Sequence, residues 1–328
     1  MPYLECFLLV PDTDIIPLSF CLNSERNVTV LSKKTCLLLG AGASKHLGFP
    51  LGFELRKKIL FELIGQKDKP ADKLPADFSR SGEDLQLFYD RLAYGNWSSP
   101  DAFLEKHREF IKTGKFLICR TLAEHEQPWG VTSNGGWYDR LVSSIHVDDV
   151  ATLRDNGLSI VTFNYDRSID FRLHKYVENH FGLDSSTAWE ILSEAIPIIH
   201  LHGTLGSYPE TPYGDKASIF ERSQSINIIS EIEDGLEQFR QASTLLNDAE
   251  RVVVFGFGFA TDNVNRLRFF KEQDQDRREI LIATGRLRGN VHDTEQQEWL
   301  SKWGLLPMKH YWPQDCNGFL DRVCNPFS

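Results

Sequence analysis

Polar side chains of chemically useful types stand directly after apolar runs in this chain. Asn164 and Asp166 follow the run that begins at Leu158, and His202 follows Ile198–Ile199. A neutral imidazole, with a pKa of about 6.5, can take a proton from a hydroxyl group or a water at physiological pH. An asparagine amide can hold the same groups in place. Both motifs also have structural explanations, since Asn and Asp are preferred helix N-caps and many histidines only pack in a core.

A glycine-rich segment has the layout of a strand, a tight turn and the start of a helix. The apolar run Cys36–Leu39 leads into Gly40-Ala-Gly-Ala-Ser44, and an amphipathic stretch begins near Leu51. Such a turn lets backbone N–H groups and the positive end of a helix approach a diphosphate. Ser44 is either a donor to a phosphate or a plain cap. The dinucleotide fingerprint Gly-x-Gly-x-x-Gly is not met, because Lys45 stands where its third glycine would be.

A second glycine turn follows the β-branched run that starts at Arg251. It contains Gly256 and Gly258, and Asp262 and Asn263 come shortly after. Simple close packing of the turn would explain its glycines, and contact with a nucleotide is the alternative. All of these motifs fall at the carboxyl ends of expected strands, which is where open α/β sheets bind their ligands.

Taken together and in this order, the segments resemble the sirtuin family, and in particular the SIR2-like domains of bacterial anti-phage defence proteins. The resemblance spans roughly residues 35–290. It implies that NAD is the substrate. Thr162-Phe-Asn164-Tyr-Asp166 matches the family's Thr-x-Asn-x-Asp segment, whose asparagine holds a ribose hydroxyl or the attacking water. Gly203 after His202 matches the family's His-Gly pair and favours His202 over His200 as the catalytic histidine.

The resemblance therefore assigns roles to two sets of residues. Asp166 would meet the nicotinamide amide while it caps the following helix, beside the catalytic candidates Asn164 and His202. The residues expected to bind NAD are Gly40, Ala41, Gly42, Ser44, Pro50, Thr162, Gly256, Gly258, Asp262 and Asn263.

The chain departs from protein-deacylating sirtuins in two places. It contains no Cys-x-x-Cys pair, so no zinc ribbon and no bound zinc are expected. Gly48-Phe-Pro50 is followed by Leu51-Gly-Phe-Glu54, with no arginine at the matching place. His200 and His202 would share one face of a strand, which raises a metal site as an alternative, but no third ligand is evident. The NAD site is thus expected without the groove for an acyl-lysine peptide.

These features predict an NAD glycohydrolase that cleaves the nicotinamide–ribose bond and gives nicotinamide and ADP-ribose. By resemblance it would be the NAD-depleting effector of an anti-phage defence system acting by abortive infection. A second defence protein (a sensor or an ATPase) or homo-oligomerisation would activate it. Two alternatives stay open: an NAD-dependent protein deacylase or ADP-ribosyltransferase, and a non-catalytic subunit that binds NAD or ADP-ribose within a complex.

Composition narrows the class of protein. The 328 residues are 41% hydrophobic and 25% charged, which is typical of a globular chain with an ample core. A formal net charge of −10 argues against direct nucleic-acid binding as the main function. No apolar stretch reaches the roughly 18–20 residues of a membrane helix, and no signal peptide is evident. Six scattered cysteines fit a reduced, cytoplasmic compartment.

Alternation of strands and helices predicts an α/β fold with a doubly wound, mostly parallel, Rossmann-like sheet. Residues 1–34 form an N-terminal segment, 35–290 the SIR2-like NAD-binding domain, and about 66–150 a helical insertion into it. Within the insertion, Ser99-Pro100-Asp101 predicts a capped helix start. The last expected strand is Glu279–Ala283. Residues 291–328 form a tail whose aromatic side chains are expected to pack on the domain or on a partner: Trp303, Tyr311, Trp312 and Phe319.

Overall fold

The computed structural model describes residues 31–64, 82–133, 136–228, 231, 236–259, 261–267, 279–283, 311–312, 315–322 and 327. The first part of the expected helical insertion, up to residue 81, lies outside this part of the chain, as do Trp303 and residues 1–30 of the N-terminal segment. None of the helices in the described part is long and apolar enough to cross a membrane.

A parallel sheet forms the centre of the molecule, as predicted. Its six strands in the described ranges follow the order β3-β2-β1-β4-β5-β6, and every neighbouring pair is parallel. Strands of this kind are apolar runs that are buried on both faces. In β1, Leu37 and Leu39 pack on one face of the sheet, and Cys36 and Leu38 pack on the other. The strands are β1 (Thr35–Leu39), β2 (Leu158–Thr162), β3 (Ile198–His200), β4 (Arg251–Phe255), β5 (Glu279–Ala283) and β6 (Tyr311–Trp312).

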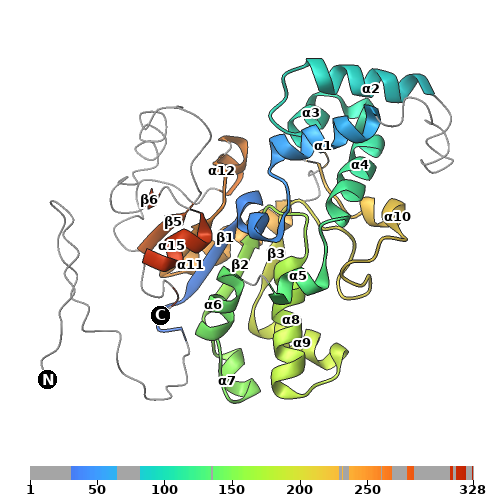
Figure 1. Ribbon diagram of the computed structural model, residues 1–328. Helices are drawn as coiled ribbons and strands as arrows, with labels where there is room; N and C mark the ends of the chain where they lie inside the picture. Colours follow the sequence, from blue (N-terminus) through green and yellow to red (C-terminus); the bar gives the residue numbers. More distant parts are fainter. Residues whose placement is uncertain are drawn as a thin grey trace, which may run out of the picture.

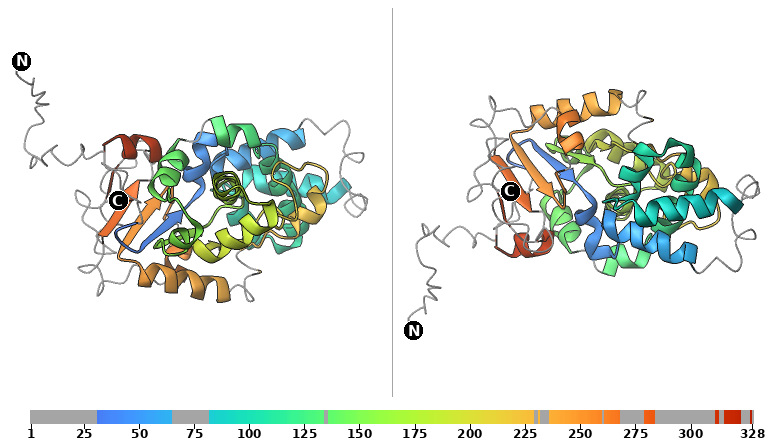
Figure 2. Two further views of the ribbon diagram at one scale, coloured as in Figure 1. Left: turned by 90° about the horizontal axis from the view of Figure 1, so that it is seen from below. Right: turned by 90° about the horizontal axis from the view of Figure 1, so that it is seen from above.

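Helices cover both faces of the sheet, so the fold is doubly wound (Figures 1 and 2). One face is covered by α6 (Trp137–Ser144), α7 (Val150–Arg154), α8 (Ser168–Phe181), α9 (Ser185–Ala195) and α15 (Cys316–Arg322). The other is covered by α11 (Leu236–Asp248) and α12 (Thr261–Leu267). Figure 2 shows the sheet between α11 on one side and α6 with α15 on the other.

A separate helical lobe stands beyond the carboxyl ends of the strands (Figure 1). It has its own core, in which Phe88 packs edge-on against Phe103 and Phe110. The Ser99 cap predicted from sequence is confirmed, because its hydroxyl accepts the Ala102 N–H at 3.1 Å. The lobe contains α1 (Gly52–Ile64), α2 (Gly82–Tyr94), α3 (Pro100–Lys106) and α4 (Ile111–Ala123). Of two further short helices, α10 (Ile219–Ser223) packs against the lobe, whereas α5 (Pro128–Ser133) joins the core on the sheet through Val131.

The boundaries of the helical block differ from the expectation. The helix after the first strand, α1, packs in the lobe, whereas α6 and α7 pack on the sheet. The lobe therefore ends near Ala123 rather than near residue 150. Sequence periodicity reveals that a helix has an apolar face, but not which core that face joins.

The C-terminal region adds a strand, β6, to the sheet. The expectation that Glu279–Ala283 is the last strand was wrong, since β6 pairs with β5 through Ile282 and Ala283. Phe319 on α15 is fully buried and contacts Phe255 with ring centroids 5.8 Å apart. Two residues form too short a strand for its pattern to be recognised in sequence. At least Phe319 therefore packs within this chain rather than on a partner.

The two glycine turns contact each other backbone to backbone where β1 and β4 end. The Gly40 N–H donates to the Phe255 carbonyl at 2.9 Å, and the Gly42 N–H donates to the Gly256 carbonyl at 3.0 Å. Gly256 has a φ of 60°, and a Cβ there would lie 2.1 Å from the Ala43 nitrogen. Close packing thus accounts for these glycines, and the N–H groups expected to face a diphosphate are already bonded.

The amphipathic stretch expected from near Leu51 forms α1, and a 3-10 helix separates it from the first turn. Ala41–Leu47 is a 3-10 helix that ends at Gly48, which has a φ of 89°. The α-helix α1 starts only at Gly52, after the apolar segment that contains Pro50. The turn therefore opens into a tight 3-10 segment before the chain enters the lobe.

Substituting Gly256 tests the contact between the turns. We expect Gly256→Ala to lower the free energy of unfolding by about 2–5 kcal/mol, because it adds both a strained φ and a backbone clash. Gly258→Ala is the matched control, since a Cβ at that position meets nothing within 4 Å. Urea denaturation measures both variants. Equal stability of the two would contradict the packing described here.

Candidate active site

A cavity of about 390 Å³ lies where the ends of β1, β2, β3 and β4 meet the helical lobe. A volume of this size is within the range of small-molecule sites. The sheet contributes the loops after its strands, and the lobe contributes α3 and the segment around Pro50. Of the residues predicted for the site, those that line the cavity are Asn164, Asp166, His202, Gly40, Ala41, Pro50, Gly258 and Asn263.

The other predicted residues lie behind the cavity wall. Gly42 and Gly256 form the contact between the turns, and the Thr162 hydroxyl accepts the Asn164 N–H at 3.0 Å. Ser44, expected to donate to a phosphate, is buried and donates to Asp166 instead. These residues position the lining rather than form it. The Asp262 side chain lies outside the described residues.

A buried chain of hydrogen bonds sets the orientation of the Asn164 amide. Asp166 Oδ1 accepts the Ser168 N–H at 3.2 Å at the start of α8, and its Oδ2 accepts the Ser44 hydroxyl at 2.8 Å. The Ser44 hydroxyl has one hydrogen, and it donates this to Asp166. In its 3.2 Å contact with Asn164 Nδ2, the Ser44 oxygen is therefore the acceptor. Asp166 therefore does not occupy the N-cap of α8, which is Arg167; it accepts the N–H of Ser168 from one position earlier, and its other oxygen meets Ser44. The Oδ1 of Asn164 is the amide atom left for a ligand.

His202 sits in an aromatic setting that keeps its ring neutral. Its ring lies 5.4 Å from that of Phe163 and 6.3 Å from that of Phe239, centroid to centroid. Burial, assisted by the positive charge of Arg266, lowers the pKa of His202 to about 4. Its Nε2 is buried without a hydrogen-bond partner in the described part of the chain. A neutral ring with an orphaned nitrogen in a cavity wall is suited to bonding a ligand hydroxyl.

His200 and His202 do not share one face, contrary to the sequence-based expectation. Strand β3 ends at His200, and the chain turns at Leu201, so the two-residue alternation of a strand stops there. His200 contacts Asp170 on α8, whereas His202 contacts Phe163 and Phe239. Among the described residues, no group of three or more His, Cys, Asp or Glu is arranged to hold a metal ion. The expectation that the chain carries no zinc stays a prediction.

Two functional candidates were missed by sequence reasoning, because the lobe brings them to the site. Asp101 and Glu105 on α3 line the cavity, and the Tyr165 hydroxyl donates to Asp101. Burial raises the pKa of Asp101, and that of Asp166 as well. The Ser99 cap motif located α3 in the sequence, but nothing in it indicated that this helix start faces the loop after β2.

A fully buried carboxylate ties the lobe to that same loop. Glu126 accepts from Arg167 at 2.9 Å and 2.7 Å, and from Arg222 at 2.6 Å. The side chains of Glu126 and Arg167 have no exposed surface, and that of Arg222 is 1% exposed. Arg167 directly follows Asp166, so the position of the site loop depends on this ionic cluster.

Comparison with known families gives one match. Residues 158–308 match the family model of the SIR2-like domain. No curated protein matches the chain. The matched range starts at β2 and contains Asn164, Asp166, His202 and the second glycine turn, whereas the first glycine turn and α3 precede it. A SIR2-like domain suggests NAD-related activity.

Glu126 offers a test of the ionic cluster. We expect Glu126→Gln to lower the free energy of unfolding by about 3–5 kcal/mol, because two buried guanidinium groups lose their counter-charge. Glu124→Gln is the control: Glu124 pairs with Lys216, its side chain is 59% exposed, and its loss should cost less than about 1 kcal/mol. Denaturant titration distinguishes the two variants. A tolerated Glu126→Gln would show that the cluster is dispensable.

Proposed function

We propose that this protein is an NAD glycohydrolase that cleaves the bond between nicotinamide and ribose and releases nicotinamide and ADP-ribose. The observation that carries the proposal is a pair of orphaned polar atoms in one cavity wall. His202 Nε2 and Asn263 Oδ1 are both buried, lack partners among the described residues, and belong to residues that line the cavity. Buried polar atoms without partners cost free energy, so two of them in one cavity favour a polar ligand such as a ribose.

The charges of the cavity favour the nicotinamide end of NAD. Asp101, Glu105 and Asp166 contribute carboxyl groups, and no Lys or Arg is among the described residues that line it. Burial raises the pKa of Asp101 and Asp166, and a cation beside them would favour their ionised forms. Nicotinamide in NAD is cationic, and cleavage develops positive charge on the ribose. The carboxyl groups therefore support both the bound ring and the transition state.

The reaction requires little acid–base catalysis. The C1′–N bond breaks with its electron pair passing to the ring nitrogen, so nicotinamide leaves neutral and needs no proton. Water then adds to C1′, and its proton is released. His202 is neutral above a pH of about 4, so its Nε2 accepts a hydrogen bond from a ribose hydroxyl or from the water throughout the physiological range.

Asn164 orients the second reactant. With Nδ2 held by Ser44, the free Oδ1 accepts a hydrogen bond from the attacking water or a ribose hydroxyl. Phe163 and Phe257 stack with centroids 4.9 Å apart beside His202, and both line the cavity. Their rings limit the access of bulk water to the cavity, so the water positioned by Asn164 is favoured as the nucleophile over bulk water.

The resemblance to SIR2-like domains of anti-phage defence proteins also supports a biological role. An enzyme that depletes NAD is toxic to its own cell, so its activity must be restrained until it is needed. We extend the proposal to an anti-phage effector whose activity is released by a second defence protein or by self-assembly. The SIR2-like match supports the NAD chemistry on which this extension rests.

Substitution of the two catalytic candidates tests the proposed function. We expect Asn164→Ala and His202→Ala each to abolish nicotinamide release from NAD, with folding retained. The measurement is nicotinamide release by the purified chain, alone and with the product of any neighbouring gene. Asn179→Ala and His180→Ala, at the far end of α8, are the controls and should keep the wild-type rate. Wild-type rates in the Asn164 and His202 variants would refute the site. Release that depends on an acyl-lysine peptide would indicate a deacylase.

A further inference from the structure

His200 bridges two hydrogen-bond acceptors next to the proposed catalytic asparagine. Its Nδ1 lies 2.9 Å from the Asn164 carbonyl oxygen, and its Nε2 lies 3.1 Å and 3.3 Å from the two Asp170 carboxylate oxygens. The side chains of His200 and Asp170 are 9% and 7% exposed. The ring therefore connects α8 to the backbone of the site loop.

The chemistry of these two contacts determines the protonation state of the ring. A backbone carbonyl can only accept a hydrogen bond, and an ionised carboxylate also only accepts. A neutral imidazole has a single N–H and can satisfy one of the two. Both contacts are hydrogen bonds only when both ring nitrogens carry protons, and the ring is then a cation paired with Asp170.

We propose that His200, held as an imidazolium by Asp170, is a positioning residue that clamps the Asn164 main chain so that its amide faces the NAD cavity. This inference rests on the proposed function for its catalytic consequence. The clamp acts together with the bond from the Asn164 N–H to Thr162, so the backbone of Asn164 is fixed on both of its polar groups. The side-chain amide then has a single orientation toward Ser44 and the cavity.

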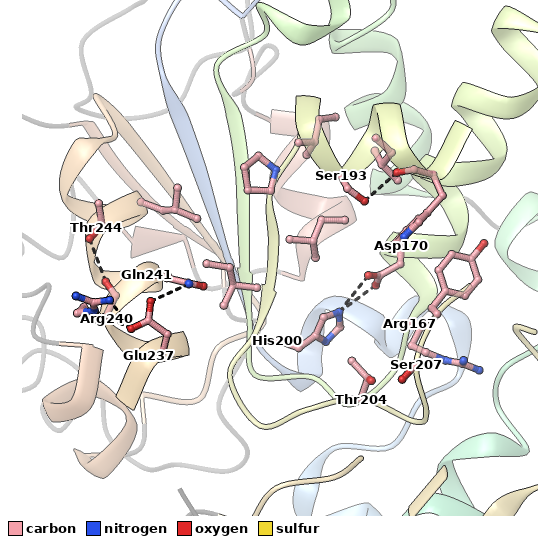
Figure 3. A pocket seen from close by; sticks show the side chains of 18 residues that line it. Arg167, Asp170, Ser193, His200, Thr204, Ser207, Glu237, Arg240, Gln241 and Thr244 are labelled. Carbon is pink, nitrogen blue, oxygen red and sulfur yellow. Dashed lines mark hydrogen bonds and ion pairs between the residues drawn. The ribbon is translucent and has the colours of Figure 1, made fainter. Parts of the chain in front are cut away.

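The surroundings of His200 agree with a cation whose proton exchanges with solvent. Burial by itself lowers the pKa of His200, but Asp170, the Asn164 carbonyl and Asp166 more than offset this and raise it. Arg167, which lines the same cavity as His200, is paired with Glu126. His200 and Asp170 face each other in the wall of a second cavity of about 850 Å³, which Arg240 and Glu237 on α11 also line (Figure 3). This cavity gives the pair a route to solvent.

The raised pKa of His200 determines the direction of the pH dependence. Because the pKa of His200 is raised on folding, the clamp is complete below the unfolded value of about 6.5 and is lost as pH rises through the folded pKa. His202 is neutral across the same range. Turnover should therefore fall on the alkaline side because of His200.

The experiment compares His200→Gln and Asp170→Asn with His174→Gln. His174 is the matched control, since it is a buried histidine on α8 whose ring bonds Tyr208 and the Ser185 carbonyl rather than Asn164 or the Asp170 carboxylate. We expect His200→Gln and Asp170→Asn to lower kcat for NAD roughly 10- to 100-fold with little change in KM, and to flatten the alkaline fall. His174→Gln should keep the wild-type kcat and pH profile.

The double variant Asp170→Asn/His200→Gln separates positioning from folding, because it leaves no unpaired buried charge. It should regain the thermal stability that either single variant loses but not the kcat. Equal kcat and pH profiles for His200→Gln and His174→Gln would overturn the proposal. So would recovery of kcat in the double variant.

Two NMR measurements need no turnover and so separate this inference from the proposed function. In histidine-labelled wild-type protein at a pH below about 6.5, we expect both His200 ring nitrogens to be protonated, and one to lose its proton in Asp170→Asn. The Asn164 side-chain amide signals, assigned with Asn164→Ala, should shift in His200→Gln and not in His174→Gln. A neutral His200, or unmoved Asn164 signals, would refute the clamp. Absence of nicotinamide release by the wild type would instead refute the proposed function alone.

Discussion

The burial of Glu126 between two guanidinium groups is the constraint on which the arrangement of the site depends. Its partners Arg167 and Arg222 also bond the carbonyls of Gly206, Thr211 and Leu205, so one carboxylate organises the long loop after β3. Removing one partner of such a pair leaves an unpaired charge out of reach of water. The lobe, the loop after β2 and the loop after β3 must therefore be placed together or not at all.

The site loop after β2 is held at consecutive residues from different directions. Asn164 is tied through its main chain to His200, Tyr165 is tied to Asp101 in the lobe, Asp166 accepts from Ser44, and Arg167 joins Glu126. A loop fixed at each residue can present an amide in one orientation, which is what positional catalysis requires. The same arrangement explains why two histidines only two residues apart differ. His202 lies among aromatic rings and stays neutral, whereas His200 lies beside Asp170 and its pKa is raised.

Sequence reasoning reached the sheet and the residues at its strand ends for physical reasons. Runs such as Arg251–Phe255 are apolar on both faces, as expected of a parallel strand that is covered by helices on both sides. The glycine turns mark where such strands end. It failed where contacts depend on the lobe. Nothing local relates Asp101 to Tyr165, or Glu126 to Arg167. The glycines were located correctly. Nucleotide binding and close packing were the alternative explanations, and close packing accounts for Gly42 and Gly256, whose backbones contact each other. The prediction that His202 shares a strand face with His200 was wrong, because β3 ends at His200.

The central claim is that NAD binds with its nicotinamide ribose between Asn164 and His202. The most direct test is a structure of the Asn164→Ala variant with NAD, in which the uncleaved substrate is retained. The account predicts a ribose hydroxyl within hydrogen-bond distance of His202 Nε2 and the nicotinamide ring beside Asp101. NAD bound in the cavity beside Arg240 instead, or no NAD bound at saturating concentration, would contradict it.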